Sequence, residues 1–401
     1  MTDDGIVRAG WPPALVYALQ FGAVGIWTAY ASIYFAELGV SLALIGVLAA
    51  VPALVAILAS PAWGLLADRL GDMRLPYLAG AVIAALAGVW VALGPATDML
   101  LAAVFVLSIG AAAMTPLLDA RTMQRLEPRR ERFGQVRAFG SGAFTVVALA
   151  TAAFVAATGL GAMFIGYAGL VLGAGIAAVL FLGRPPAAVL LVGAGPLAAI
   201  GLLRDRSLLL FFTGSVFVWT AAVGTMTLFS LRIIELGGDS ALAATGWAIN
   251  ALWEVPFMLG FARFARRFRV EHLIVIGAVL FVIRGVLWTL SPTPVLLIAF
   301  TVVGAAAFAF VLVGTAAFVA ERAPDHLQAT AQALFGATTF ALGSIAGAVL
   351  AGQIAAVAGI PAIYPAGVVA SAIGAVLIWL GIARRRGAED AQVQEPLTTA
   401  A

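Results

Sequence analysis

The chain has 401 residues, of which 63% are hydrophobic and 10% charged, with a formal net charge of +3. Soluble globular domains carry about 25% charged residues, so the composition excludes a water-soluble fold and indicates an integral membrane protein. Cysteine is absent, which excludes disulfides, thiol catalysis and cysteine-based metal sites.

Apolar segments of about 20 residues, the length that crosses about 30 Å of hydrocarbon, recur along the chain. Six lie in the first half, at Ala14–Ala36, Leu44–Ala67, Leu75–Gly94, Met99–Ala120, Val136–Thr158 and Gly161–Leu182. Six more lie in the second half, at Leu208–Ile234, Leu242–Ala262, Leu273–Leu290, Val295–Val319, Ala329–Val357 and Ala362–Ala383. The pattern predicts an all-α fold of twelve transmembrane helices. No apolar signal-peptide core precedes the first segment, so we expect that segment to stay in the mature protein.

The placement of arginines predicts the orientation in the membrane. With the N-terminus in the cytoplasm, Arg232 is the one basic residue of the external loops, and Arg284 falls within a helix. The other arginines lie in cytoplasmic loops, at cytoplasmic helix ends or in the termini, mainly in 121–137, 263–269 and 384–386. This asymmetry follows the positive-inside rule. We therefore expect both termini to be cytoplasmic, in a bacterial inner membrane.

The segment Arg184–Arg206 is apolar, but its prolines and glycines leave no run long enough to span a bilayer. We interpret it as a cytoplasmic connector with an interfacial helix around Leu197–Leu203. The predicted organisation is an N-terminal six-helix bundle (1–183), a linker (184–206), a C-terminal six-helix bundle (207–383) and a cytoplasmic tail (384–401).

The residue types present exclude several function classes. All 22 basic residues are arginine, so neither a Walker A phosphate loop nor a lysine Schiff base can form. His272 and His326 are far apart in the sequence, and no metal-binding motif is present. We therefore expect no cofactor, no metal and no enzyme activity. The expected partners are the lipid bilayer and a small-molecule substrate, without nucleic acid, and the expected state is a monomer.

A weak internal repeat relates the two halves. The stretch GLLADRLGDMR at Gly64–Arg74 follows the second segment, and GFARFARRFR at Gly260–Arg269 follows the eighth. Duplicated halves are typical of major facilitator transporters. The first stretch resembles the signature loop of that superfamily, although Asp72 and Met73 stand where basic residues are usual. The resemblance implies a gating role for the matching residues, which are Gly64, Asp68, Arg69 and Gly71.

A second resemblance is to the lactose permease and phenylpropionate permease branch. It is carried by FGQVRAFGS at Phe133–Ser141, by the spacing of Asp119 from Arg137 and by that of Glu254 from Arg284. The resemblance implies that Asp119 and Arg137 contact the substrate and that a proton is the coupling ion. Residues on the same face of the helix as Arg137 join this predicted substrate site, namely Ser141 and Phe144. Phe144 replaces the tryptophan that stacks on sugar in lactose permeases, and Asp119 replaces a longer acid.

The eighth segment carries a polar and aromatic stripe. Trp247, Asn250 and Glu254 share one helical face. A charge near the middle of the bilayer costs about 2.5–3.5 kcal/mol, so it usually faces a cavity or a partner. We expect Trp247 and Asn250 to bind substrate, and Glu254 to carry the proton with Arg284 as its counter-ion. The alternative is a static pair that fixes helix packing.

The helix 10 positions that couple the proton in lactose permeases are Gly304 and Ala307 here. Either Glu254 alone carries the proton, or the protein is a uniporter or uses another ion. Gln20 and Tyr30 on the first helix are further candidates for the cavity, although a tyrosine near a helix end can also belong to the interfacial belt.

The predicted function is transport of a small organic solute by alternating access, as a proton symporter. The alternatives are an exporter of amphipathic compounds, a uniporter, or a membrane-embedded enzyme or receptor.

Overall fold

The structure is a computed structural model that describes residues 3–127, 132–183, 205–322 and 335–398. Within these ranges every regular element is helical, which confirms the all-α prediction. The first half of the chain contains α1 (Asp3–Glu37), α2 (Leu42–Leu70), α3 (Arg74–Ala92), α4 (Thr97–Arg125), α5 (Phe133–Thr158) and α6 (Met163–Phe181).

The second half contains more elements because several of its helices are interrupted. They are α8 (Arg206–Thr227), α9 (Phe229–Glu235), α10 (Ser240–Ala265), α11 (Val270–Thr289), α12 (Pro294–Ala299), α13 (Thr301–Arg322), the π-helix η3 (Gly336–Leu342), α15 (Gly343–Ala358), the 3-10 turn η4 (Ile360–Ala362) and α16 (Ile363–Thr398).

Eleven helical segments in the described part of the chain are long and apolar enough to cross a membrane. Helix α10 is not among them, although its 26 residues would suffice in length. Its polar residues lower its hydropathy, and it packs against α13 and α5 in the middle of the molecule. Together with α10, the eleven segments account for the twelve predicted helices.

The helix ends follow from local sequence. Ser41 and Asp239 are in extended conformations and cap α2 and α10, with the Asp239 carboxylate accepting from the backbone N–H of Leu242 at 2.7 Å. Gly71 ends α2 with a φ of 60°, a left-handed conformation that glycine adopts without steric cost. Its N–H donates to the carbonyl of Asp68.

The structure differs from the predicted segments in three places. The segment Leu208–Ile234 is broken at Leu228, which has a non-helical φ of −111° and separates α8 from α9. The segment Val295–Val319 is divided into α12 and α13 at Phe300. Helix α16 continues to Thr398, so the predicted tail is helical as far as it is described. The proposed connector helix at Leu197–Leu203 lies outside the described residues.

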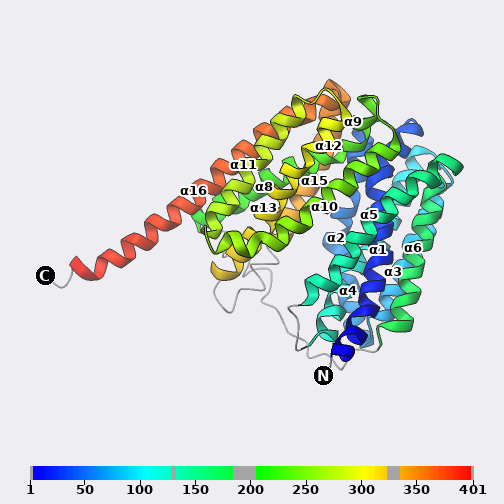
Figure 1. Cartoon of the computed structure of the whole chain (residues 1–401), viewed down its shortest axis with the longest axis horizontal. Coiled ribbons are helices and arrows are strands. Elements are labelled where there is room, and N and C mark those ends of the chain that lie inside the picture. Colours follow the sequence, from blue (N-terminus) through cyan, green and yellow to red (C-terminus); the bar gives the residue numbers. More distant parts are fainter. Residues whose placement is uncertain (1–2, 128–131, 184–204, 323–334, 399–401) are drawn as a thin grey trace.

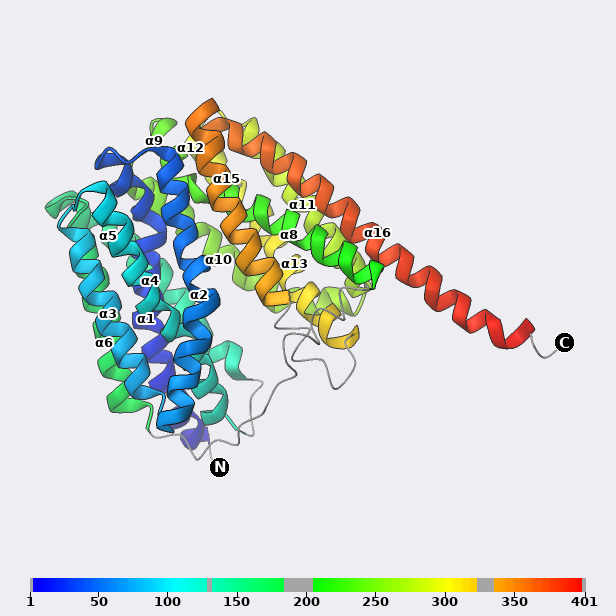
Figure 2. The same ribbon diagram turned by 180° about the vertical axis from the view of Figure 1, so that it is seen from behind.

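The helices form two groups, α1–α6 and α8–α16, that converge at one end of the molecule and diverge at the other (Figure 1, Figure 2). We call the first the joined end; it contains α9, α12 and the turns at Gly39 and Gly359. The second, the diverging end, contains the N-terminus and the turn at Gly71. At the joined end α2 packs against α15, and α10 packs against α5.

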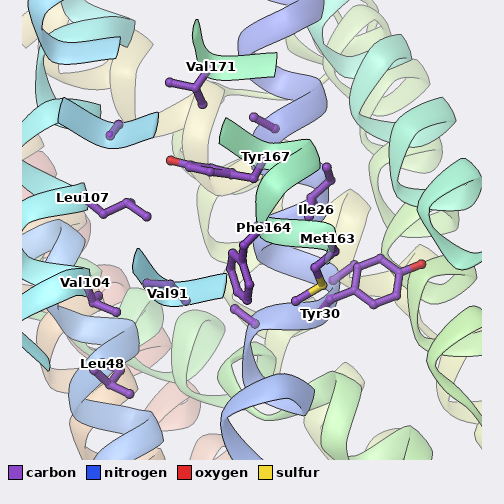
Figure 3. Close-up of a cluster of buried hydrophobic side chains, with 14 of the residues drawn as sticks. Ile26, Tyr30, Leu48, Val91, Val104, Leu107, Met163, Phe164, Tyr167 and Val171 are labelled. Carbon is purple, nitrogen blue, oxygen red and sulfur yellow. The ribbon is translucent and has the colours of Figure 1, made fainter. Parts of the chain in front are cut away.

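The first group is held by a core in which α1, α2, α3, α4 and α6 all take part (Figure 3). Phe164 and Tyr167 of α6 pack beside Trp27 of α1, with ring centroids 5.8 and 6.1 Å from that indole. Tyr34 of α1 donates a hydrogen bond to the carbonyl of Val91 at 2.9 Å. These contacts fix α1, whose opposite face borders the second group of helices.

Candidate substrate cavity

A cavity of about 360 Å³ lies between the two groups of helices. Its wall is formed by the last turns of α1, the first turns of α2 and parts of α8, α10, α11 and α13. The aromatic residues of the wall are Trp27, Phe35, Trp219, Trp247, Phe281 and Phe308. The polar and charged residues are Thr28, Ser32, Thr227, Asn250, Glu254 and Arg284. The cavity therefore combines flat apolar surfaces with one acid and one base.

Glu254 lies on α10, two helical turns after Trp247. Its carboxylate accepts a hydrogen bond from the side-chain amide of Asn250 at 2.7 Å, one helical turn earlier. The i, i+4 spacing places the two side chains on one face, and both line the cavity. The acid therefore has a neutral partner.

Arg284 lies on a different helix of the cavity wall, α11, and is only 4% exposed. Its Nη2 donates to the hydroxyl of Thr225 at 2.6 Å. The guanidinium carbon lies 4.9 Å from the ring centre of Phe281 and 4.5 Å from that of Trp288, distances at which a cation is attracted to an aromatic face. Its Nε is buried and has no hydrogen-bond partner in the described part of the chain.

Gly304 of α13 provides the space for this side chain. A Cβ at Gly304 would lie 2.6 Å from Cδ of Arg284 and 3.0 Å from its Nη1. Any other residue at this position would displace the arginine.

The sequence predicted Arg284 as the counter-ion of Glu254. Both line the cavity, but they form no ion pair in this structure: among the described residues Glu254 is bonded to Asn250, and Arg284 to Thr225. The predicted ion pair between Glu254 and Arg284 is therefore not formed in this conformation.

Asp119 and Arg137 lie outside the cavity. Asp119 on α4 accepts a hydrogen bond from the hydroxyl of Tyr17 on α1. The guanidinium of Arg137 on α5 stacks on Phe21, 4.6 Å from the ring centre, and lies 5.7 Å from that of Tyr17. Its Nη1 is buried without a hydrogen-bond partner within the described ranges. The predicted acid and base therefore both interact with Tyr17, in the first group of helices.

Ser141 and Phe144, which were also predicted to bind substrate, are absent from the cavity wall. The carbonyl of Phe144 is in close contact with α1, 2.7 Å from where a Cβ on Gly25 would lie. Ser141, one turn earlier on α5, is half-buried.

Gln20 and Tyr30 have packing partners within the first group of helices. The amide of Gln20 donates to Thr115 at 2.6 Å and its carbonyl accepts from Tyr77 at 2.8 Å. Tyr30 donates to the carbonyl of Ala148 at 2.9 Å. One face of α1 lines the cavity although it was not predicted to do so; it carries Thr28, Ser32 and Phe35. The i, i+4, i+7 spacing of these residues could have revealed this face in the sequence.

The predicted gating loop lies at the diverging end. Gly64 is half-buried, whereas Asp68 and Arg69 are exposed and form no ion pair within the described part of the chain. Asp72, which departs from the signature, is 8% exposed and accepts from Arg74 at 2.7 Å. The loop therefore forms an ion pair at a position that the signature does not include.

Comparison with known proteins gives a consistent result. Residues 11–364 match the model of the MFS_1 like family. The chain is 27% identical over 332 residues to the maltose permease of Geobacillus stearothermophilus, covering 82% of this chain and 84% of the permease. Similar solved structures include the nucleoside transporter NupG, with a TM-score of 0.81 and 19% identity over 94% of this chain and 98% of the other.

Another similar structure is a bacterial homologue of the human lysosomal transporter Spinster in an inward-facing, unoccupied conformation. Its TM-score is 0.73 and its identity 16%, over 93% of this chain and 96% of the other. The family match and the transporter relatives identify the chain as a membrane transporter rather than an enzyme. The chain belongs to the MFS_1 like family.

Proposed function

We propose that this transporter is a proton-coupled symporter that takes up a small organic solute, of the size of a sugar, a nucleoside or an aromatic acid. The solute would bind in the cavity between Trp247 and Asn250 on α10 and Arg284 on α11. Ligand pockets usually enclose about 300–1,000 Å³, and a cavity of about 360 Å³ fits one such molecule. The names of the relatives, a maltose permease and a nucleoside transporter, favour solutes of this size.

The observation that carries the proposal is the cavity carboxylate of Glu254. Its hydrogen-bond partner is the neutral amide of Asn250, so protonation breaks no ion pair in this conformation. An acid at membrane depth beside a water-accessible cavity is a common proton site in transporters. In the proposed cycle Glu254 releases its proton when it approaches Arg284, and takes up a proton when the two are apart.

Alternating access requires that the two groups of helices rock about the cavity. We propose that the diverging end faces the cytoplasm, because the arginine-rich loops and the N-terminus belong to that end. The structure would then correspond to the inward-facing member of the cycle. The predicted lactose permease and phenylpropionate permease branch would add Asp119 and Arg137 as solute contacts in another conformation.

The test is solute flux in proteoliposomes with an imposed pH gradient, using labelled maltose, adenosine and benzoate, with protein-free liposomes as the control for passive entry. We expect protein-dependent accumulation of at least one of these probes. Glu254→Gln mimics the protonated acid, so it should abolish accumulation while solute exchange continues. Accumulation at the wild-type level in Glu254→Gln would exclude Glu254 as the proton site.

A second candidate is export of amphipathic compounds, which is favoured by the six aromatic side chains of the cavity wall. The same vesicles distinguish the two. An exporter moves an amphipathic dye in the direction opposite to the protons. A symporter moves its solute in the same direction as the protons. Equal exchange with and without a gradient would instead indicate a uniporter.

A further inference from the structure

We infer that Arg284 is the anchor for a carboxylate group of the solute, so that the transported molecule is an organic monoanion with a flat apolar body. This inference rests on the proposed function of the cavity and specifies the chemical class of its solute. Arg284 is 4% exposed, and its recorded hydrogen bond is to the neutral hydroxyl of Thr225. A buried cation with no acid bonded to it is unfavourable unless a ligand supplies the negative charge.

Among the residues that the structure describes, no other group near the site neutralises this charge. The neighbouring charged and titratable groups are Glu254 on α10, Tyr364 on α16, and Arg232 and Glu235 on α9. Glu235 is already bonded to Arg232 at 2.7 Å. The lining stretches of α1, α2, α8 and α13 contribute no charged side chain. Within the described ranges, Glu254 is therefore the one acid of the cavity wall that can compensate Arg284, and it is bonded to Asn250 here.

An unsatisfied hydrogen-bonding group of the cavity wall also points to a ligand. The Nε of Arg284 is buried and has no hydrogen-bond partner among the described residues. A guanidinium presents parallel N–H groups that match the two oxygens of a carboxylate. Gly304 leaves the space against α13 that keeps this side chain at the cavity wall.

The aromatic side chains of the cavity wall favour a particular shape for the rest of the solute. Trp27, Trp219, Trp247 and Phe308 present aromatic surfaces to the same cavity. Flat apolar groups pack well on such rings. One guanidinium balances one negative charge, so a dianionic phosphate ester would leave an excess charge in the cavity. The site is therefore matched to a monocarboxylate and not to a neutral sugar or a phosphate.

Charge balance couples this anion to the proton. With Glu254 ionised, the charges of Glu254 and Arg284 already cancel, and an added carboxylate leaves the cavity with an excess negative charge. With Glu254 protonated, one carboxylate on Arg284 restores neutrality. Proton and solute therefore bind together, and their joint movement carries no net charge across the membrane.

The experiment compares ligands of equal shape and different charge on the purified full-length chain. Binding of benzoate and benzamide is measured by thermal shift at mildly acidic and mildly alkaline pH, with maltose and adenosine as neutral solutes. We expect benzoate to bind about tenfold or more tightly than benzamide, because hydrogen bonds to charged groups are the stronger ones. We also expect binding to weaken at alkaline pH. Benzoate that binds no better than benzamide, while maltose or adenosine binds, would overturn the inference.

Two variants test the charge argument. Arg284→Gln should remove the preference for benzoate over benzamide, whereas the matched control Arg232→Gln, which alters an arginine paired outside the cavity, should keep it. Glu254→Gln retains Arg284, so it is informative even if Arg284→Gln does not fold. It should bind benzoate equally at both pH values. Pronounced pH dependence in Glu254→Gln would overturn the coupling of anion to proton.

Flux separates this inference from the proposed function. Benzoate-driven transport measured electrically on supported membranes should show no net charge movement, and a sustained current would overturn the charge balance. Preferred binding of benzoate without proton-driven accumulation would support the carboxylate site while contradicting the symport proposal. Proton-driven accumulation of neutral solutes without binding of benzoate would contradict the carboxylate site while supporting the symport proposal.

Discussion

Gly46 of α2 and Gly352 of α15 meet across the joined end, so closely that a Cβ on Gly46 would lie 2.7 Å from the Cα of Gly352. The same Cβ would lie 2.5 Å from the carbonyl of Ala348. Neither glycine position leaves room for a side chain, since a Cβ on Gly352 would in turn lie 2.8 Å from the Cα of Gly46. The contact therefore exists only while the joined end is closed.

We predict that Gly46→Ala opens the joined end. Overpacking costs typically 1–3 kcal/mol, which corresponds to about a 5-fold to 160-fold shift toward conformations in which the two helices separate. In this cysteine-free chain, a cysteine at Ser32 in the cavity wall reports the change through labelling by an impermeant maleimide from outside. Gly169→Ala is the matched control, since nothing lies within 4 Å of its added Cβ. Unchanged labelling in Gly46→Ala would exclude this contact as a gate.

Ser230 forms a second link at the joined end. Its hydroxyl donates to the carbonyl of Ala29 on α1 at 2.8 Å and accepts from the indole N–H of Trp247 at 3.0 Å. Trp247 also lines the cavity, so the link connects the solute site with the closure between the two groups of helices.

We predict that Ser230→Ala increases outside labelling of the same reporter by about 2-fold to 10-fold, since a hydrogen bond contributes about 0.5–1.5 kcal/mol. Trp247→Phe keeps a ring in the wall but lacks the N–H donor, and should have a similar effect. Ser291→Ala is the control, because that buried hydroxyl bonds to the nearby carbonyl of Leu287 at the end of α11, and not to another helix. Equal labelling in Ser230→Ala and Ser291→Ala would contradict the prediction.

Gly304→Ala should weaken solute binding without unfolding the protein. The added Cβ would lie 2.6 Å from Cδ of Arg284, and the flexible arginine must move away from the wall. Loss of one charge-assisted hydrogen bond predicts roughly a 10-fold or greater loss of affinity. The measurement is binding of the transported solute by thermal shift. Gly166→Ala is the control, since its Cβ would meet Ile26 at an ordinary 3.7 Å.

Arg137→Ala distinguishes a solute contact from a packing residue. If the acid and base of the first group of helices contact solute in another conformation, the variant should lose transport while its melting temperature stays close to that of the wild type. Arg137→Lys should also fail, because a lysine lacks the planar fork of donors. Wild-type affinity in Arg137→Ala would restrict this side chain to its stacking on Phe21 and Tyr17.

The proposed orientation can be tested by labelling. A cysteine in place of Ala388, on the extension of α16, should react only from the cytoplasmic side, and one in place of Asp239, at the joined end, only from outside. The absence of native cysteine removes any background. Reaction of both from the same side would refute the predicted twelve-helix topology.

The sequence alone determined the membrane fold and most of the helices. Apolar runs of the right length are a direct consequence of the bilayer thickness, and the Trp247, Asn250 and Glu254 stripe followed from helical periodicity. All three of these residues line the cavity. Such features depend on local sequence, which is why they could be predicted without a structure.

Tertiary structure decided which polar residues face the cavity. The sequence could not show that Gln20 and Tyr30 are used in packing within the first group of helices, or that Asp119 is bonded to Tyr17. Those choices depend on which helices are neighbours, and contacts between residues far apart in the chain have no local signature. The space that Gly304 gives Arg284 is of the same kind, because it exists only where α13 and α11 meet.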